Sequence, residues 1–214
     1  MIKTRKAVSP LDPVWEQIST EAQEAVAKQP LMGGLIHACI LHHPTLEKAL
    51  SYRIAAKLCS NEMSMVILRE IVDTAFASDP SLIAAARADL MAVYDRDPAC
   101  TSYLQPLLFF KGFMALQASR FAHVLWTTGG KPLAQVIQMR VSDVFGVDIH
   151  PGAQIGRHFF IDHGFTVIGE TAIIGDNVTI AAEIRQRFAK RNTVERALAQ
   201  ALQSALGRAY CPHA

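Results

Sequence analysis

The segment from residue 149 to residue 180 carries an aliphatic side chain at about every sixth position. One interval in this series is seven residues long, and it contains the pair Asp162 and His163. A period of six fits neither a helix, at about 3.6, nor a half-buried strand, at about 2. It fits a hexapeptide β-helix, which takes one aliphatic side chain on each of three flat faces and predicts about two turns of about eighteen residues here. The series consists of Ile149, Ile155, Ile161, Ile168, Ile174 and Ile180.

Residues 1–146 have the pattern of consecutive helices. Asp12 and Pro13 supply an N-cap and an N1 proline before VWEQISTEAQEAVAK. Asp79 and Pro80 do the same before SLIAAARADLMAVY. These signals predict helices that begin at both places.

Two further helices are predicted before the six-residue period begins. A long segment, roughly 103–127, carries leucine and phenylalanine at helical spacing, and Gly129 and Gly130 supply its C-terminal stop. A helix over about 132–144 then leads to Gly146, where the period changes. The boundary between a helical domain and a β-helix is therefore expected near Gly146.

The region after residue 181 has no six-residue period and is rich in alanine, glutamine and arginine. One apolar stripe predicts a helix that covers the open end of the repeat, because repeat proteins need a terminal cap. We therefore expect an α-helical N-terminal domain (1–146), a partial left-handed hexapeptide β-helix (147–181) and an atypical helical tail (182–214). The stripe consists of Val194, Leu198, Leu202 and Leu206.

Composition is that of a globular protein. Of its 214 residues, 50% are hydrophobic and 19% are charged, and the formal net charge of +2 favours neither nucleic acid nor an acidic membrane as a partner. The four cysteines form no CxxC pair, which favours reduced thiols in a cytosolic protein. No apolar stretch follows the basic N-terminus or approaches the roughly 20 residues of a membrane span. A cytoplasmic protein is therefore expected.

The segment VFGVDIHPGAQIGRHFFIDH, followed by VIGETAIIGDNVTI, closely resembles the serine O-acetyltransferase family. Upstream, YDRDPAC and PLLFFKGFMALQASRFAHVLW resemble the helical domain of that family, so the resemblance covers about residues 12–180. It implies acetyl transfer from acetyl-CoA to the hydroxyl of L-serine in cysteine biosynthesis. Acetyl-CoA is then a cosubstrate, and no cofactor is bound permanently. Family members are trimers, often paired into hexamers, which implies a homo-oligomer.

The resemblance also implies roles for four residues of this chain. It places His163 as the general base that takes the serine proton, because a neutral hydroxyl is a poor nucleophile. A histidine with an unperturbed pKa of about 6.5 suits this task. Asp148 matches the carboxylate that pairs with the base, and adjacent turns could bring it near His163. Asp97 and Asp162 match carboxylates that bind the ammonium group of serine.

Other interpretations of these residues remain open. A single aspartate in a loop is usually a turn former, and Asp97 before Pro98 could cap the next helix. The pair His158 and His163 resembles two zinc ligands of γ-class carbonic anhydrases, which are also left-handed β-helices. A catalytic zinc site needs at least three protein ligands, and no third histidine lies two turns away, so no metal site is predicted.

The sequence departs from the family in two places. The loop reads DHGFTVIGET, one residue shorter than the family pattern and without its second glycine. Since glycine readily adopts a positive φ, this change affects the expected direction of His163. After Ile180 the family continues with a V-T-L-G-G-T stretch, an Arg-His pair that holds serine, and further turns that cradle CoA. None of these occurs in this sequence, which appears truncated in its β-helix, so reduced activity or none is expected.

These departures leave several hypotheses beside a serine O-acetyltransferase. The chain could be a non-catalytic oligomerisation remnant of the family, or could acetylate another small hydroxyl or amine. The tail could be an alternative cap or a product of out-of-frame reading. The C-terminal isoleucine with which the family docks to cysteine synthase is absent from the sequence, which ends at Ala214, so this docking is not expected.

Overall fold

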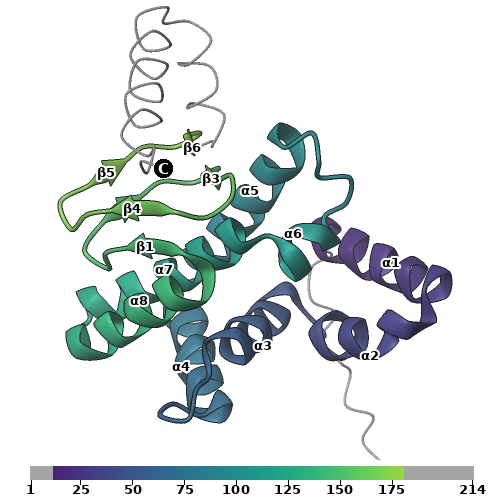
Figure 1. Ribbon diagram of the computed structural model, residues 1–214, viewed down its shortest axis with the longest axis horizontal. Coiled ribbons are helices and arrows are strands. Elements are labelled where there is room, and N and C mark those ends of the chain that lie inside the picture. Colours follow the sequence, from purple (N-terminus) through teal and green to yellow (C-terminus); the bar gives the residue numbers. More distant parts are fainter. Residues whose placement is uncertain (1–11, 181–214) are drawn as a thin grey trace, which may run out of the picture. The chain divides into compact units, whose positions relative to one another are not determined.

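The computed structural model describes residues 12–180, in which helices come first and short strands follow (Figure 1). The predicted tail helix of residues 182–214 lies outside the described residues. The helices are α1 (Pro13–Lys28), η1 (Pro30–Met32), α2 (Gly33–Ile36), η2 (His37–Leu41), α3 (Leu46–Leu58), α4 (Met65–Ser78), α5 (Ser81–Arg96), α6 (Leu104–Phe109), α7 (Lys111–Thr127) and α8 (Lys131–Phe145). The strands are β1 (Val147–Ile149), β2 (Gln154–Ile155), β3 (Phe160–Ile161), β4 (Thr166–Ile168), β5 (Ile173–Ile174) and β6 (Thr179–Ile180).

Both predicted helix starts are confirmed. The Asp12 side chain accepts a hydrogen bond from the Trp15 amide at 3.3 Å, which satisfies one of the free N–H groups in the first turn of α1. At the start of α5, the Asp79 side chain accepts from the Ser81 amide at 2.9 Å.

The single helix predicted for about 103–127 is wrong, because Phe110 is extended and separates α6 from α7. The buried Arg53 explains the break. Its guanidinium donates to the carbonyl oxygens of Leu107 and Leu108, at 3.1 and 2.8 Å. These carbonyls therefore have partners without a continuing helix. As a result, the start of α7 lies next to the strands.

Glycines end the next two helices, as predicted. After α7, Gly129 has φ 98°, and the amide of Gly130 donates to the Leu125 carbonyl at 2.8 Å. At the end of α8, Gly146 adopts the left-handed conformation with φ 69°. The strands begin at the next residue, Val147.

The strands form three parallel pairs, β1 with β4, β2 with β5, and β3 with β6. Val147 pairs with Thr166 and Gln154 with Ile173, an offset of 19 residues in both cases. This is one residue more than three hexapeptides, in agreement with the single interval of seven. Two turns of a parallel coil are thus confirmed, and its left-handed sense stays a prediction from the resemblance.

The helices support the first turn of this coil. Helix α8 contacts β1, and α7 contacts β1 and β3, so the strands lie against the helical part (Figure 1). The isoleucines of the series point inward to different depths. Ile149, Ile161 and Ile168 are buried, whereas Ile155, Ile174 and Ile180 are half-buried.

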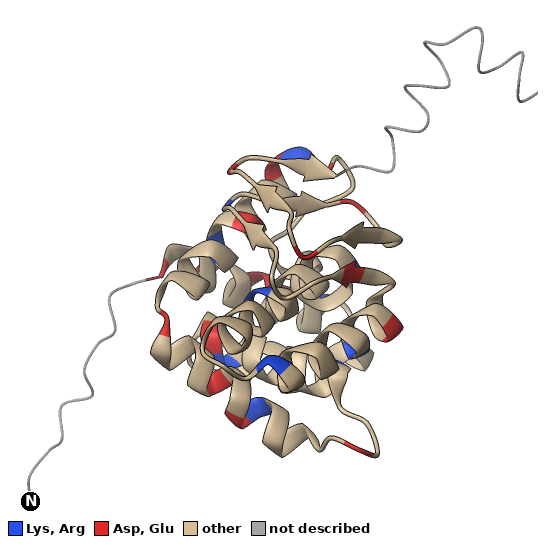
Figure 2. Ribbon diagram, turned by 90° about the vertical axis from the view of Figure 1, so that its left-hand side faces the viewer, with Lys and Arg blue, Asp and Glu red and all other residues tan. Residues whose placement is uncertain are grey.

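Basic and acidic residues are interspersed over the helices, in keeping with the small net charge (Figure 2). Cys39, Cys59 and Cys100 are free thiols, and Cys211 lies outside the described residues. Within residues 12–180, no helix is both long enough and apolar enough to cross a membrane.

Candidate functional site

A cavity of about 630 Å³ lies where the end of α5, the start of α7, the end of α8 and the loop after β3 meet. Three of the four predicted site residues line it: Asp97, Asp162 and His163. They come from positions more than 60 residues apart in the sequence. The structure therefore brings together the residues that the resemblance singled out, with the exception of Asp148.

Asp97 follows the last residue of α5 and closes a tight turn. Its side chain accepts from the Ala99 amide at 2.8 Å, and its carbonyl accepts from the Cys100 amide at 2.9 Å. The turn-forming interpretation of Asp97 is thus correct as far as it goes. One carboxylate oxygen makes this local bond, and the residue also faces the cavity.

The loop after β3 has an unusual backbone. His163 and Phe165 have φ of 69° and 65°, in the left-handed region that non-glycine residues rarely adopt. The amide of Phe165 donates to the Gly146 carbonyl, which ties this loop to the end of α8. The loop therefore reaches left-handed geometry without the second glycine of the family pattern.

His163 lies at the mouth of the cavity, with 79% of its side chain exposed. Its Nδ1 is hydrogen bonded to the carboxylate of Asp162, whose side chain is only 19% exposed. This arrangement leaves Nε2 of the imidazole directed away from the pair. Such a ring can act as a general base.

Asp148 is placed differently from the prediction. Its Oδ1 accepts from Nε2 of Gln138 at 2.7 Å, and it does not line the cavity. Within residues 12–180, no hydrogen bond joins Asp148 to His163. The expected pairing of these two residues stays a prediction from the resemblance.

Burial lowers the acidity of two groups next to Asp97. It raises the pKa of the Cys100 thiol, whose Sγ donates to the Ser102 carbonyl at 3.3 Å. Burial likewise raises the pKa of Tyr103. Cys100 therefore stays a protonated thiol at neutral pH and is no candidate nucleophile.

Gly112, at the start of α7, allows β3 to approach this helix closely. A Cβ at this position would lie 2.1 Å from the carbonyl oxygen of Ile161, the residue directly before Asp162. The backbone of β3 would have to move, and the Asp162–His163 loop would move with it. The position thus needs glycine because of a tertiary contact.

We expect Gly112→Ala to lower the free energy of unfolding by about 1–3 kcal/mol, as overpacking does elsewhere. Urea denaturation followed by circular dichroism measures this change. Gly34→Ala is the matched control, because no atom lies within 4 Å of a Cβ there. The control is expected to raise stability slightly, since alanine favours a helix over glycine. Equal effects of the two substitutions would contradict the proposed role of Gly112.

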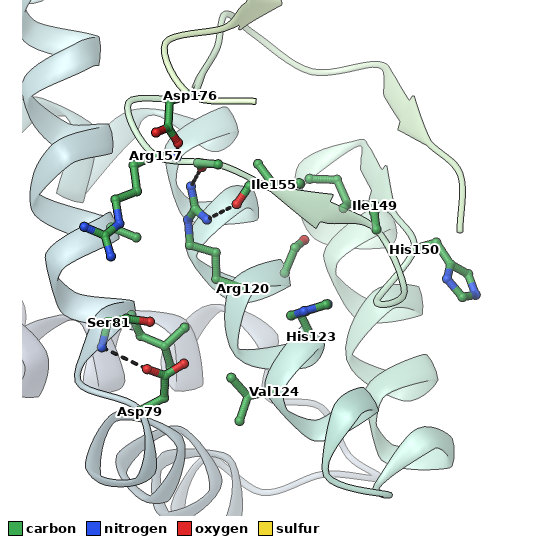
Figure 3. A pocket seen from close by; sticks show the side chains of 15 residues that line it. Asp79, Ser81, Arg120, His123, Val124, Ile149, His150, Ile155, Arg157 and Asp176 are labelled. Atoms are coloured by element: carbon green, nitrogen blue, oxygen red, sulfur yellow. Dashed lines mark hydrogen bonds between the residues drawn. The ribbon is translucent and has the colours of Figure 1, made fainter. Parts of the chain in front are cut away.

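The buried pair Asp89 and Arg120 was missed in the sequence. Arg120 of α7 donates to Asp89 at 2.8 Å and to the carbonyls of Ile155 and Gly156 at 2.9 and 2.6 Å (Figure 3). Asp89 in turn accepts from the Phe159 amide at 2.9 Å. The pair therefore joins α5 and α7 to the backbone of the coil. The signal was a charged residue on the apolar face of each helix.

A second cavity, of about 360 Å³, lies beside this pair and is lined by α5, α7 and the turns around β2 (Figure 3). Nδ1 of His123 is 2.7 Å from the Pro151 carbonyl, so this nitrogen carries the proton. None of the four predicted site residues lines this cavity. The predicted chemistry therefore belongs to the larger cavity. Among the described residues, no three histidine, cysteine, aspartate or glutamate side chains are grouped to hold a metal ion.

Comparison with known proteins agrees with the larger cavity as the site. The family described as "Serine acetyltransferase, N-terminal" matches residues 14–118. Probable serine acetyltransferase 5 of rice (Oryza sativa subsp. japonica) is 46% identical over 168 residues, which cover 78% of this chain and 49% of the rice protein. The chain thus spans about half the length of this curated relative.

Solved structures of the same family share the fold. Soybean serine acetyltransferase complexed with serine is 45% identical, with a TM-score of 0.77, and the match covers 81% of this chain and 72% of the soybean chain. Serine acetyltransferase from Brucella abortus strain S19, in complex with coenzyme A, is 42% identical with a TM-score of 0.79. That match covers 82% of this chain and 71% of the other. Sequence and structure agree over most of the described residues, and the chain belongs to the serine acetyltransferase family.

Proposed function

We propose that this chain is a serine O-acetyltransferase, which transfers the acetyl group of acetyl-CoA to the hydroxyl of L-serine in cysteine biosynthesis. Family membership supports the proposal. The single observation that carries it is the convergence of Asp97, Asp162 and His163 on one cavity. A base and two carboxylates in one cavity suit a substrate with a hydroxyl and an ammonium group.

In the proposed reaction, the imidazole of His163 takes the hydroxyl proton while the serine oxygen attacks the thioester carbon. The carbon–sulfur bond then breaks, and the CoA thiolate takes the proton from the imidazolium. The resemblance assigns Asp148 the role of stabilising that imidazolium, which stays a prediction. Acetyl-CoA is a cosubstrate in this scheme, and no permanently bound cofactor is required.

The charges around the cavity fit an amino-acid substrate. The carboxylates of Asp97 and Asp162 suit the ammonium group of serine, as the resemblance predicts. Lys111, at the start of α7, also lines the cavity, and its positive charge suits the substrate carboxylate. Cation and anion lie on one surface, so both ends of a zwitterion have a partner there.

A thiol-release assay on the purified chain tests the proposal. Acetyl-CoA and L-serine are expected to release CoA thiol well above the rate with acetyl-CoA alone. Ethanolamine, which lacks the carboxylate, and 3-hydroxypropanoate, which lacks the ammonium, are the matched comparison substrates. Equal rates with all three would contradict a serine-specific enzyme, and no release with any of them would contradict the proposed activity.

We further propose that the chain forms a homo-oligomer in the cytoplasm. Three large apolar side chains of the second turn are exposed to solvent, namely Phe165 (98%), Val167 (79%) and Ile173 (78%). Such a group of exposed apolar residues is typical of a protein–protein interface. Light scattering coupled to gel filtration measures the assembly, and a strictly monomeric chain would contradict this proposal.

A further inference from the structure

Two carboxylates compete for the role of orienting His163. The family pairing assigns this role to Asp148, on the adjacent turn of the coil. In the structure, Asp148 and Asp162 are each engaged, but by different partners. The partner of each decides which of them can fix the imidazole.

Asp148 is held by helix α8. It lies between the buried residues Val147 and Ile149 on β1, so its side chain points out of the coil. There its Oδ1 accepts from the side-chain amide of Gln138 at 2.7 Å, in a half-buried setting. This bond fixes the carboxylate toward α8.

His163 is held by its own loop. The Phe165 amide is bonded to the Gly146 carbonyl, and a Cβ on Gly164 would lie 3.1 Å from the Phe145 carbonyl oxygen. The loop is thus pressed against the end of α8 on both sides of Gly164. With φ of 69° at His163, the ring turns back toward the preceding side chain, and its Nδ1 meets the Asp162 carboxylate.

We propose that Asp162, rather than Asp148, is the positioning residue that orients the His163 imidazole for proton abstraction. The inference rests on the proposed acetyltransferase function. An ionised carboxylate only accepts hydrogen bonds, so the proton of the neutral ring is on Nδ1. Nε2 then has the free lone pair, which takes the proton of the substrate hydroxyl.

This assignment redistributes the roles in the site. Asp162 holds the tautomer and stabilises the imidazolium that forms, as the aspartate of a hydrolase triad does. The ammonium group of the substrate then depends mainly on Asp97, which lies in the same cavity. The one-residue-shorter loop is the reason for the change, because it brings Nδ1 to the adjacent residue.

Nitrogen NMR of the full chain labelled with ¹⁵N-histidine tests the proposal without any need for activity. The signals of His163 are identified by their loss in His163→Asn. Under conditions in which the neutral ring predominates, the wild-type spectrum is expected to show the Nδ1–H tautomer. Asp162→Ala is expected to shift the ring toward the Nε2–H tautomer, and Asp148→Ala is expected to leave it unchanged.

The reverse pattern, in which Asp148→Ala changes the tautomer and Asp162→Ala does not, would overturn the assignment. Thermal unfolding of both variants checks that each is folded before its spectrum is interpreted. A wild-type ring in the Nε2–H form would also overturn it. These outcomes are independent of whether the chain acetylates serine.

Kinetics provide the second readout if thiol release is observed. Asp162→Ala is expected to lower kcat by about 10²-fold, because a misplaced catalytic group costs about that much. Asp97→Ala is expected to act mainly on the KM for serine. A change in KM alone for Asp162→Ala would return Asp162 to the role of a substrate anchor. Absence of release in the wild-type chain contradicts the proposed function and leaves the tautomer assignment to the NMR result.

Discussion

Replacing His163 by asparagine is expected to lower kcat/KM for serine by about 10²–10⁴-fold, the contribution of a positioned general base. Asparagine tolerates the left-handed backbone that His163 adopts, at φ 69°. The substitution therefore removes the base with little backbone strain. Steady-state thiol release with serine and acetyl-CoA measures the loss.

His158→Asn is the matched control for this experiment. His158 also has a positive φ, 55°, and lies in the same coil, but it does not line the larger cavity. Its backbone carbonyl, which the substitution retains, accepts from Arg96 at 3.1 Å. We expect nearly wild-type activity for the control. A fully active His163→Asn protein would rule out His163 as the base.

Asp89→Ala is expected to lower the free energy of unfolding by about 3–5 kcal/mol, because it leaves a buried charge without its partner. The Asp89 side chain is fully buried. It accepts from the side chains of Gln117 and Arg120, at 3.0 and 2.8 Å, and from the Phe159 amide at 2.9 Å. Removing it leaves the Arg120 guanidinium, 10% exposed, and a buried amide without this acceptor. Guanidinium denaturation followed by fluorescence and circular dichroism measures the change.

Asp73→Ala is the control for a surface ion pair. Asp73 and Lys48 are 3.0 Å apart, with side chains 29% and 46% exposed. Exposed pairs contribute at most about 1 kcal/mol, so a small effect is expected. If the two variants lost equal stability, burial of the Asp89–Arg120 pair would not be the source of its contribution. The Asp89 variant is also expected to lose activity, since this pair joins the helices to the coil.

The coil and the helix starts were predictable because they are local properties of the chain. One inward side chain per face imposes a period of six, whatever surrounds the segment. The capping residues Asp12 and Asp79 each act on an amide no more than three residues away. The glycines that end α7 and α8 also act within a few residues. Such features need no knowledge of the rest of the fold.

The break at Phe110 was not predictable in this way. The apolar spacing continues through it, and the cause is Arg53, more than 50 residues earlier in the chain. The close approach of Gly112 to Ile161 is likewise a contact between distant segments. Both features place the start of α7 in the cavity. The shape of the candidate site therefore depends on contacts that leave no local signal.

The sequence by itself determined the helical part, the two turns of the coil, and the family to which His163 and its surroundings belong. These follow from side-chain periodicity, from capping within one helical turn, and from a motif of adjacent residues. Only the tertiary structure decided which carboxylate meets the imidazole. Gln138 holds Asp148, and the backbone of the short loop turns His163 toward Asp162. The physical reason is that hydrogen bonding requires a few ångströms and a given direction, which depend on how α8, β1 and the loop pack together.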